Sequence, residues 1–469
     1  MNKIKKALIG LVCAIGTLSA EERPNIIYIL ADDLGYGDLG CYGQEVLETP
    51  NIDRLAAEGM RFTQHYAGNT VCAPSRSALL EGKHTGRTMV RGNIPYHLMD
   101  SDAPTLGKLM KQAGYATACI GKWGVGHLPP LDDPEIHGFE HFYGYVNMWH
   151  AHNFYPEYLY RNGEKDYLEG NVLDERIKFD RQPKGSGVAK EKEVFAPYEL
   201  ERETLEYLKQ ERDRPFFLYL ALNQPHNNGE YGRIYGDGGY EVPGYREYTN
   251  RDWPRSEKGF ATNISIIDDI VGNILDTLES QGIAENTIVM FSSDNGACQG
   301  AGHSYKFFKS TGGLRGYKRD LYEGGIRVPF IAKWPGKVTE GSESEHISAS
   351  WDLLPTFCEI AGVDAPSDID GISMLPALTE EGEQEQHKYL YWEFYSKGGR
   401  QALRKRDWKA VKLHVIDEEP EVFELYNLAE DLFETNDLSG DYPEIAKEMK
   451  LLMAEAHEPH DVMKLYPDE

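Results

Sequence analysis

The stretch that decides the fold is Asn25-Ile26-Ile27-Tyr28-Ile29-Leu30, which is followed directly by Ala31-Asp32-Asp33. Its apolar run is continuous and rich in β-branched residues, a pattern typical of a strand buried on both faces. Similar runs recur along the chain at Tyr115 to Ile120, Phe216 to Leu222, Thr287 to Phe291 and Val328 to Ala332. We therefore expect these five segments to be strands of one sheet.

Helical patterns lie between these runs, at Pro50 to Gly59, Leu106 to Ala113, Glu199 to Gln210 and Thr262 to Ser280. Strands that alternate with helices predict an α/β fold in which a mostly parallel central sheet has helices on both faces. Two stretches rich in Gly and Tyr, 149–166 and 227–251, show little periodicity. We expect both to be long surface loops, which are often functional.

The pattern changes after Gly371. Residues 389–395 and 408–415 alternate like antiparallel strands, and residues 442–457 have a helical pattern. The sequence therefore predicts an N-terminal catalytic domain over residues 21–373 and a smaller C-terminal α+β subdomain, an antiparallel sheet plus a helix, over residues 374–469.

The N-terminus has the features of a signal peptide. Lys3, Lys5 and Lys6 precede an apolar run from residue 7 to 18, and Ser19-Ala20 offers a small-residue cleavage site. We expect residues 1–20 to be removed and the protein to be exported, either periplasmic or secreted. No other segment approaches the roughly 20 apolar residues that a membrane span requires.

The charge of the chain excludes one class of partner. The 469 residues include 49 Lys and Arg against 76 Asp and Glu, which gives a net charge of −27. Nucleic-acid binding requires a basic face, so we expect no nucleic-acid partner.

Polar side chains follow the predicted strands at their carboxyl ends, where open α/β sheets bind ligands. They are Asp32 and Asp33, Lys122, His226, and Asp294 with Asn295. If the strands are parallel, these groups converge on one edge of the sheet. Three carboxylates and an amide oxygen are hard donors that suit Ca²⁺ or Mg²⁺, so the sequence predicts a metal-assisted site.

A cysteine lies at a predicted helix start, in Cys72-Ala73-Pro74-Ser75-Arg76. Pro74 suits the first helical turn, so Cys72 is expected just outside the helix N-terminus with Arg76 about one turn away. Taken alone, this pattern fits a low-pKa thiol beside a cation or an ordinary buried cysteine equally well. Removal of Cys13 with the signal peptide leaves five cysteines. An odd number in an exported protein indicates that one thiol has another fate, although free buried cysteines are also common.

The segment from Cys72 to Gly82 resembles the signature of the type I sulfatases, C-x-P-S-R followed by a helix that ends in Gly. Further motifs match in the family's order: Ala31-Asp32-Asp33, Gly121-Lys122-Trp123, Ser293-Asp294-Asn295-Gly296, and Gly316-Tyr317-Lys318 leading into Glu323-Gly324-Gly325. The resemblance covers most of residues 23–460. It implies the alkaline-phosphatase-like fold and hydrolysis of sulfate esters.

The resemblance also implies the roles of the site residues. Cys72 would be oxidised to formylglycine by a formylglycine-generating maturation enzyme, and a hydroxyl of the hydrated aldehyde would attack sulfur. Asp32, Asp33, Asp294, Asn295 and the modified Cys72 would bind Ca²⁺, with Mg²⁺ as an alternative. Arg76, Lys122 and Lys318 would neutralise the sulfate oxygens, and His226 would protonate the leaving oxygen.

One position departs from the family. Many members have a histidine where this chain has Gly124, and that histidine assists the formylglycine hydroxyl. His127, His150 or His152 could take over its role, or no residue does.

The substrate is expected to be a sulfated oligosaccharide or polysaccharide. The Tyr, Trp and His content of residues 143–160 suits stacking on a sugar ring, and residues 150–156 and 316–323 resemble bacterial members that act on sulfated galactose or N-acetylgalactosamine. The negative charge favours exo action, with His303, Arg315 and Arg319 as local anchors for substrate. Two alternatives remain: a phosphonate or phosphate ester hydrolase of the same superfamily, and a non-catalytic glycan-binding protein on the same scaffold.

Overall fold

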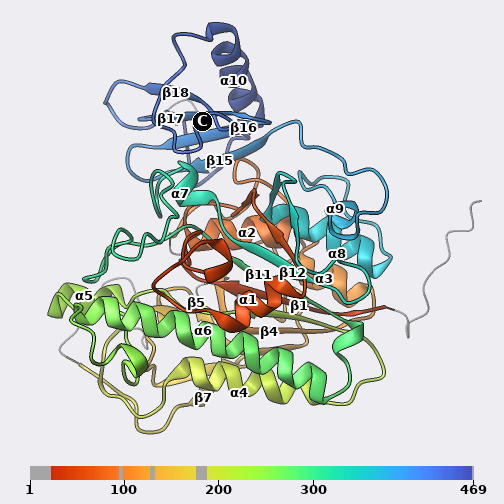
Figure 1. Ribbon diagram of the computed structural model, residues 1–469, viewed down its shortest axis with the longest axis vertical. Coiled ribbons are helices and arrows are strands. Elements are labelled where there is room, and N and C mark those ends of the chain that lie inside the picture. The colour runs from red at the N-terminus through yellow and green to blue at the C-terminus, as the bar shows by residue number, and fades with distance from the viewer. Residues whose placement is uncertain (1–22, 95–98, 127–132, 176–186, 467–469) are drawn as a thin grey trace, which may run out of the picture.

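The computed structural model describes residues 23–94, 99–126, 133–175 and 187–466, and Figure 1 shows their arrangement in a larger and a smaller domain. The predicted signal peptide lies outside the described residues. A ten-stranded sheet forms the centre of the larger domain. Its strands, in spatial order, are β13 (Ser342–Ser344), β2 (Met60–Phe62), β12 (Phe330–Lys333), β11 (Thr287–Ser293), β1 (Asn25–Ala31), β10 (Phe216–Ala221), β4 (Ala116–Gly126), β5 (His141–Asn147), β6 (Tyr158–Arg161) and β7 (Glu164–Tyr167).

The five strands at the centre, β11, β1, β10, β4 and β5, are parallel, which confirms the predicted α/β class. Alternate residues of β1 enter two different cores. Ile27 and Ile29 face one core and Ile26 and Tyr28 the other, because successive side chains of a strand point to opposite faces. This explains why the run is apolar at every position.

Helices cover both faces of the sheet, as Figure 1 shows. One core is completed by α1 (Pro50–Ala57), α4 (Ala196–Leu208) and α6 (Arg255–Ser280). The other is completed by α2 (Cys72–Glu81), α3 (Leu106–Gln112), α8 (Leu353–Ala361) and α9 (Leu375–Thr379). Two short strand pairs lie outside the main sheet: β3 (His65–Tyr66) with β14 (Ser348–Ala349), and β8 (Val172–Leu173) with β9 (Ala189–Glu191).

Two of the predicted strands differ from expectation. β12 runs antiparallel to β11, so its carboxyl end does not reach the edge where the polar residues gather. β4 does not end at Ile120 but continues to Gly126, with an irregular register between Lys122 and Gly126. Lys122 therefore lies within a strand.

Both predicted surface loops contain regular structure. Residues 149–166 hold a 3-10 helix, η2 (His150–His152), and most of the β6–β7 hairpin. The hairpin turns at Asn162 and Gly163, which both have positive φ. Asn-Gly between two strands is the signal of a two-residue hairpin turn, and the expectation of a loop overlooked it. Residues 227–251 contain α5 (Gly229–Tyr235) and η3 (Arg246–Tyr248).

The C-terminal subdomain is an antiparallel sheet of β15 (Leu390–Phe394), β16 (Arg400–Lys405), β17 (Trp408–Leu413) and β18 (Val422–Asn427), covered by α10 (Pro443–Ala456). A buried ion cluster joins it to the larger domain. Lys409 Nζ lies 2.9 Å from carboxylate oxygens of both Glu323 and Glu434, and Glu323 begins α7 (Glu323–Ile326). The boundary at residue 374 stays a prediction, and Leu378 of α9 packs in a core of the larger domain.

No helix among the described residues is long and apolar enough to cross a membrane. Five cysteines of the described chain, Cys41, Cys72, Cys119, Cys298 and Cys358, are free thiols.

Candidate active site

The carboxyl ends of β1 and β11 bring four oxygen-bearing residues together. Asp32 and Asp33 follow β1, and Asp294 and Asn295 follow β11 beside it. The Asp33 amide donates to Asp294 Oδ1 at 3.2 Å, and Asn295 Nδ2 donates to Asp33 Oδ1 at 2.8 Å. All four residues are buried. The predicted convergence at this edge is thus present in the structure.

Each of the three predicted sulfate-binding cations contacts one of these carboxylates. Arg76 Nε and Nη2 donate to Asp294 Oδ2 at 3.0 and 2.8 Å. Lys318 Nζ lies 2.6 Å from Asp33 Oδ1, and Lys122 forms an ion pair with Asp32. Arg76 Nη1 also donates to the Lys122 carbonyl at 2.6 Å. Three carboxylates and three cations therefore alternate within one buried cluster.

The ion pairs set the pKa values of the cluster. Burial would raise the pKa of Asp32 and Asp33, but the ammonium groups of Lys122 and Lys318 outweigh it and hold both pKa values below their usual range. Burial and the charge of Asp32 raise the pKa of Asp294 to about 7, in spite of Arg76. Burial opposes the charge of Lys318, yet Asp33 raises its pKa above the ordinary value.

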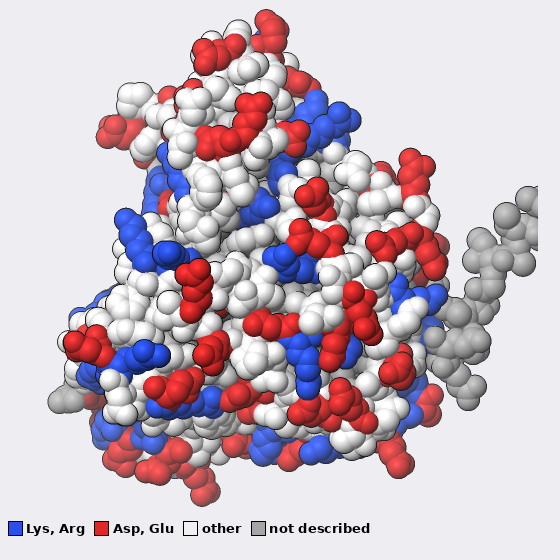
Figure 2. Space-filling model, in the orientation of Figure 1, with Lys and Arg blue, Asp and Glu red and all other residues white. Residues whose placement is uncertain are grey.

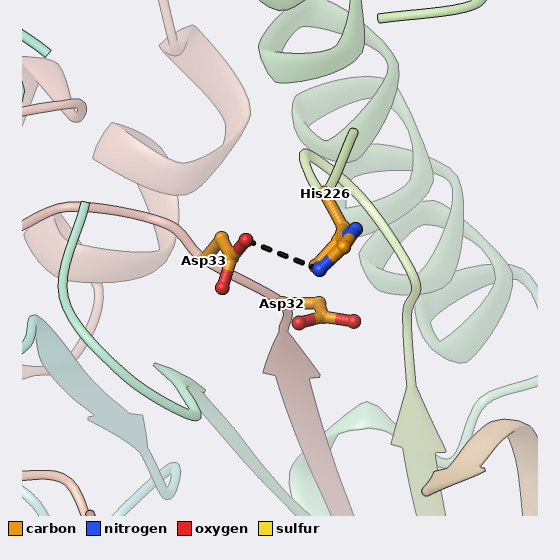
Figure 3. A group of neighbouring side chains, drawn as sticks. All are labelled: Asp32, Asp33 and His226. Atoms are coloured by element: carbon orange, nitrogen blue, oxygen red, sulfur yellow. Dashed lines mark ion pairs between the residues drawn. The ribbon is translucent and has the colours of Figure 1, made fainter. Parts of the chain in front are cut away.

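The donor set fits a hard divalent cation. Asp32 Oδ1 and Asn295 Oδ1 are buried and have no hydrogen-bond partner among the described residues. Ligand atoms of Asp32, Asp33 and His226 lie within 4.8 Å of one another, and Figure 3 shows the three side chains facing one another. Buried oxygens without partners are costly, and a bound cation would satisfy both of them.

Cys72 is the first residue of α2, one position further into the helix than predicted. Its side chain is 1% exposed, and Asn93 Nδ2 lies 3.3 Å from its Sγ. Arg76, four residues further along the same helix, belongs to the cation cluster, so Cys72 begins the helix that carries one of the three cations. Asn93 also accepts from the Ala73 amide at 3.1 Å, and no motif pointed to this residue.

His226 is held in one orientation. Its Nδ1 donates to the Asn227 carbonyl at 2.7 Å, so Nε2 is the nitrogen that faces Lys318 Nζ at 3.2 Å and Asp33 Oδ2 at 3.4 Å, the contact drawn in Figure 3. Burial, and then the charge of Lys318, lower the pKa of His226 to about 3. Without substrate, the proton between these two side chains therefore lies on Lys318.

The three histidines proposed to replace the one missing at Gly124 have different positions. His152 stacks on His226, and its Nδ1 lies 3.7 Å from a carboxylate oxygen of Glu230. His150 is buried between Tyr145 and Tyr158, and burial lowers its pKa to about 3. His127 lies outside the described residues.

Gly124 itself faces the site. Its φ is +77°, and a Cβ at this position would lie 2.9 Å from Arg76 Cδ and 3.4 Å from Lys122 Cε. A side chain here would therefore reach the cations around Cys72.

The three residues predicted to anchor substrate differ in whether their side chains are exposed and free of other contacts. His303 is buried, with Nδ1 2.6 Å from Glu257, and stacks on Phe260. Arg315 lies over the ring of Tyr322 and donates to Tyr426 Oη and the Glu434 carbonyl, both at 2.7 Å. Arg319 is exposed. The roles of all the site residues stay predictions.

Gln224 was not singled out from the sequence. It follows β10, its carbonyl accepts from the Asp32 amide at 2.8 Å, and both polar atoms of its buried side chain have no partner among the described residues. The signal that could have found it is its place in Asn223-Gln224-Pro225-His226, at the end of a central strand.

Two family models match the chain. A model described as Sulfatase matches residues 24–363, and one described as N-sulphoglucosamine sulphohydrolase, C-terminal, matches residues 315–459. N-acetylgalactosamine-6-sulfatase of Homo sapiens is 34% identical over 392 residues, which cover 78% of this chain and 68% of that protein.

Two solved structures share the whole fold. Ps i-CgsB in complex with k-i-k-neocarrahexaose superposes with a TM-score of 0.76 at 25% identity and covers 95% of this chain and 96% of its own. A protein from a study of how Bacteroides thetaiotaomicron metabolises multiple glycosaminoglycans gives a TM-score of 0.74 at 25% identity, over 93% of this chain and 99% of its own. The chain therefore belongs to the sulfatase family, with an alkaline-phosphatase-like fold, and is a sulfuric ester hydrolase.

Proposed function

We propose that the protein removes sulfate esters from carbohydrates, using a formylglycine formed from Cys72 and a Ca²⁺ ion. The observation that carries this proposal is that Cys72 begins α2, the helix that also holds Arg76, whose guanidinium belongs to the buried cluster of three cations and three carboxylates. A hydrated formylglycine there would supply the nucleophilic hydroxyl.

The residues that would hold the metal are Asp32, Asp33, Asp294 and Asn295, and Ca²⁺ would supply positive charge beside the sulfate group. Mg²⁺ fits the same donors less well, because it demands a more rigid geometry. The unpartnered oxygens of Asp32 and Asn295 support this assignment.

The chain's own side chains would bind and polarise the sulfate ester. Arg76, Lys122 and Lys318 carry fixed positive charge in a water-excluded cluster, where charge stabilisation is strong. The leaving oxygen needs a proton as the bond to sulfur breaks. Lys318 Nζ, which holds the proton before substrate binds, lies 3.2 Å from His226 Nε2, so His226 would take up a proton when an anionic substrate is bound and deliver it from Nε2.

The substrate we infer is sulfated galactose or N-acetylgalactosamine at the end of a chain. Support comes from the relative that acts, by its name, on N-acetylgalactosamine-6-sulfate and from the neighbour in complex with k-i-k-neocarrahexaose. Export through the N-terminal signal would bring the enzyme to polysaccharides outside the cytoplasm.

The direct test is desulfation of a panel of defined sulfated mono- and disaccharides by protein produced together with a maturation enzyme. Mass spectrometry of the Cys72 peptide should show formylglycine in active protein only. Faster turnover of phosphonate or phosphate esters than of sulfate esters of the same alcohol would favour the rival hydrolase instead.

A further inference from the structure

We propose that Arg319, with Lys397 and Arg400 of the C-terminal subdomain, binds a second anionic group of the substrate, either a carboxylate or a second sulfate ester. This inference rests on the proposed function, because it requires that the substrate be a sulfated saccharide. It adds that the preferred saccharide carries at least two negative groups.

The first observation is an unusual turn. The Tyr317 carbonyl accepts from the Asp320 amide at 2.8 Å, which places Lys318 and Arg319 at the two central positions. Arg319 has a φ of +77°. The third position of such a turn favours Gly, because a side chain there strains the backbone. Strained backbone positions are enriched at functional sites, and this one directly follows Lys318 of the catalytic cluster.

The second observation is that the two cations of this turn have different surroundings: Lys318 is buried in the catalytic cluster, whereas Arg319 is exposed. Lys318 Nζ contacts Asp33 inside the catalytic cluster. The Arg319 amide donates to Thr70 Oγ1 at 2.7 Å and to the Thr70 carbonyl at 3.1 Å, and Thr70 is two residues before Cys72. The Arg319 side chain is exposed, and its guanidinium has no partner among the described residues. A cation without a partner among the described residues is thus anchored by its backbone to Thr70, two residues before Cys72.

The third observation is that two cations of the C-terminal subdomain, Lys397 and Arg400, contact this turn. Lys397 Nζ lies 3.1 Å from Asp320 Oδ1, and Arg400 forms an ion pair with the same carboxylate and donates to the Arg319 carbonyl at 3.2 Å. The carboxylate of Asp320 therefore pairs with both Lys397 and Arg400, and the Arg319 side chain remains without a carboxylate partner among the described residues. In Figure 2, basic side chains gather on the visible face where the two domains meet, although the chain as a whole is strongly acidic.

An aromatic surface adjoins these cations. Tyr305 and Tyr317 stack with 4.8 Å between ring centres, and Lys397 Nζ lies 5.4 Å from the centre of the Tyr317 ring. Both tyrosines are half-buried, so part of each ring is available. Aromatic faces beside charged groups suit a sugar ring that carries an anion at its edge.

The test compares Arg319→Gly with Arg406→Gly. Arg406 is also exposed with a positive φ of 55°, but it lies in the turn at the other end of β16, so its replacement removes the same charge and the same strain away from the site. Both variants should fold and melt at or above the temperature of the parent. Three substrates are compared: an aryl sulfate, a monosulfated neutral sugar, and the same sugar bearing either a neighbouring uronate or a second sulfate.

We expect Arg319→Gly to lose about tenfold in kcat/KM on a dianionic saccharide, the effect of one charge-assisted hydrogen bond. Its activity on the other two substrates and all activities of Arg406→Gly should stay within about twofold of the parent. Loss only with the uronate, or only with the disulfated sugar, identifies which anion is bound. Equal losses on all substrates, or none on either dianion, would overturn the inference while leaving the proposed function standing.

A binding measurement tests the inference without requiring turnover. Cys72→Ala protein should bind the dianionic saccharide more tightly than the monosulfated one, and Arg319→Gly in that background should abolish the difference. If the matured parent desulfates no saccharide, the proposed function fails. Calorimetry of the Cys72→Ala protein with and without Arg319→Gly then tests the inference by itself. Tighter binding of the dianionic saccharide that Arg319→Gly abolishes supports the inference, and equal binding of the two saccharides by Cys72→Ala protein overturns it.

Discussion

The imidazole ring of His152 stacks on that of His226, with 4.3 Å between ring centres and 15° between ring planes. The two residues come from segments more than 70 positions apart, η2 and the end of β10. Because the Asn227 carbonyl fixes Nδ1 of His226 and His152 fixes its plane, Nε2 can point only toward Lys318 and Asp33. This rigidity is what an acid that protonates one particular oxygen requires.

His226→Ala should lose far more rate on a sulfated sugar than on an aryl sulfate. A sugar alcohol needs a proton as it leaves, whereas a phenol leaves readily without one, and general acid catalysis is typically worth about 10²- to 10⁴-fold. Lys318→Ala removes positive charge from both reactions and should harm both more evenly. The measurement is kcat/KM of both variants on both substrate types. Similar losses for His226→Ala on the two substrates would move the acid role to another residue.

Ca²⁺ should raise the melting temperature of the protein, and chelation should lower it. A ligand that binds only the folded state stabilises by about 2.7 kcal/mol at a free concentration one hundred times its Kd. Asp294→Asn should abolish the Ca²⁺-dependent shift and the activity, because it removes one of the three carboxylates of the cluster. Differential scanning fluorimetry with and without the ion tests this. An unchanged shift in the variant would contradict the assignment of Asp294 as a ligand.

Gly124→Ala should lower both stability and activity. A φ of +77° disfavours any side chain by about 1 kcal/mol, and the new methyl group would press on Arg76 Cδ, which must then shift from the sulfate site. Gly282→Ala is the matched control, because Gly282 has a φ of +69° with open space around its Cβ position. The free energy of unfolding should fall by a similar amount in both variants, because both place a side chain at a positive φ. Only Gly124→Ala should also have a lower kcat/KM. Full activity of Gly124→Ala would show that Arg76 tolerates the displacement.

The link between the domains should show a pH dependence that comes from His387. Its Nε2 lies 2.9 Å from both carboxylate oxygens of Asp352, and although burial opposes the charge, Asp352 raises the pKa of His387 above 6.5. Because the pKa is higher in the folded state, the stabilisation is complete below pH 6.5 and is lost as the pH rises through the folded value.

His387→Gln keeps a neutral donor to Asp352 and removes this titration. The difference in melting temperature between parent and variant should therefore be largest below pH 6.5 and shrink as the pH rises above it. A difference that stays constant over this range would mean that His387 does not change its charge on unfolding.

The fold and the convergence of Asp32, Asp33, Asp294 and Asn295 could be predicted from the sequence because both follow from one local rule. The buried parallel strands are largely apolar, so the change to polar residues, at Asp32 after β1 and from Ser292 at the end of β11, marks the edge of the sheet. The antiparallel direction of β12 could not be predicted in this way, because Phe330 to Lys333 is as apolar as its parallel neighbours.

Other parts of the site depend on contacts that leave no local pattern. Asn93 reaches Cys72 from a loop with no motif, and the stacking of His152 on His226 joins two separate segments. His150 has the same local sequence context as His152, yet only the three-dimensional packing places it between two tyrosines and away from solvent.

The burial of Cys72 has a consequence for how active protein can be obtained. Every residue of α2 is buried, Cys72 included, and Asn93 Nδ2 lies 3.3 Å from the Cys72 Sγ. If Cys72 is oxidised to formylglycine, as proposed, the oxidising enzyme needs access to a side chain that the folded protein buries, so we expect it to act before folding is complete. Protein refolded from inclusion bodies would then reach the native structure with an intact thiol and remain inactive, whatever is added afterwards. The order of synthesis, oxidation and folding, rather than the final structure, would decide how much of a preparation can turn over substrate.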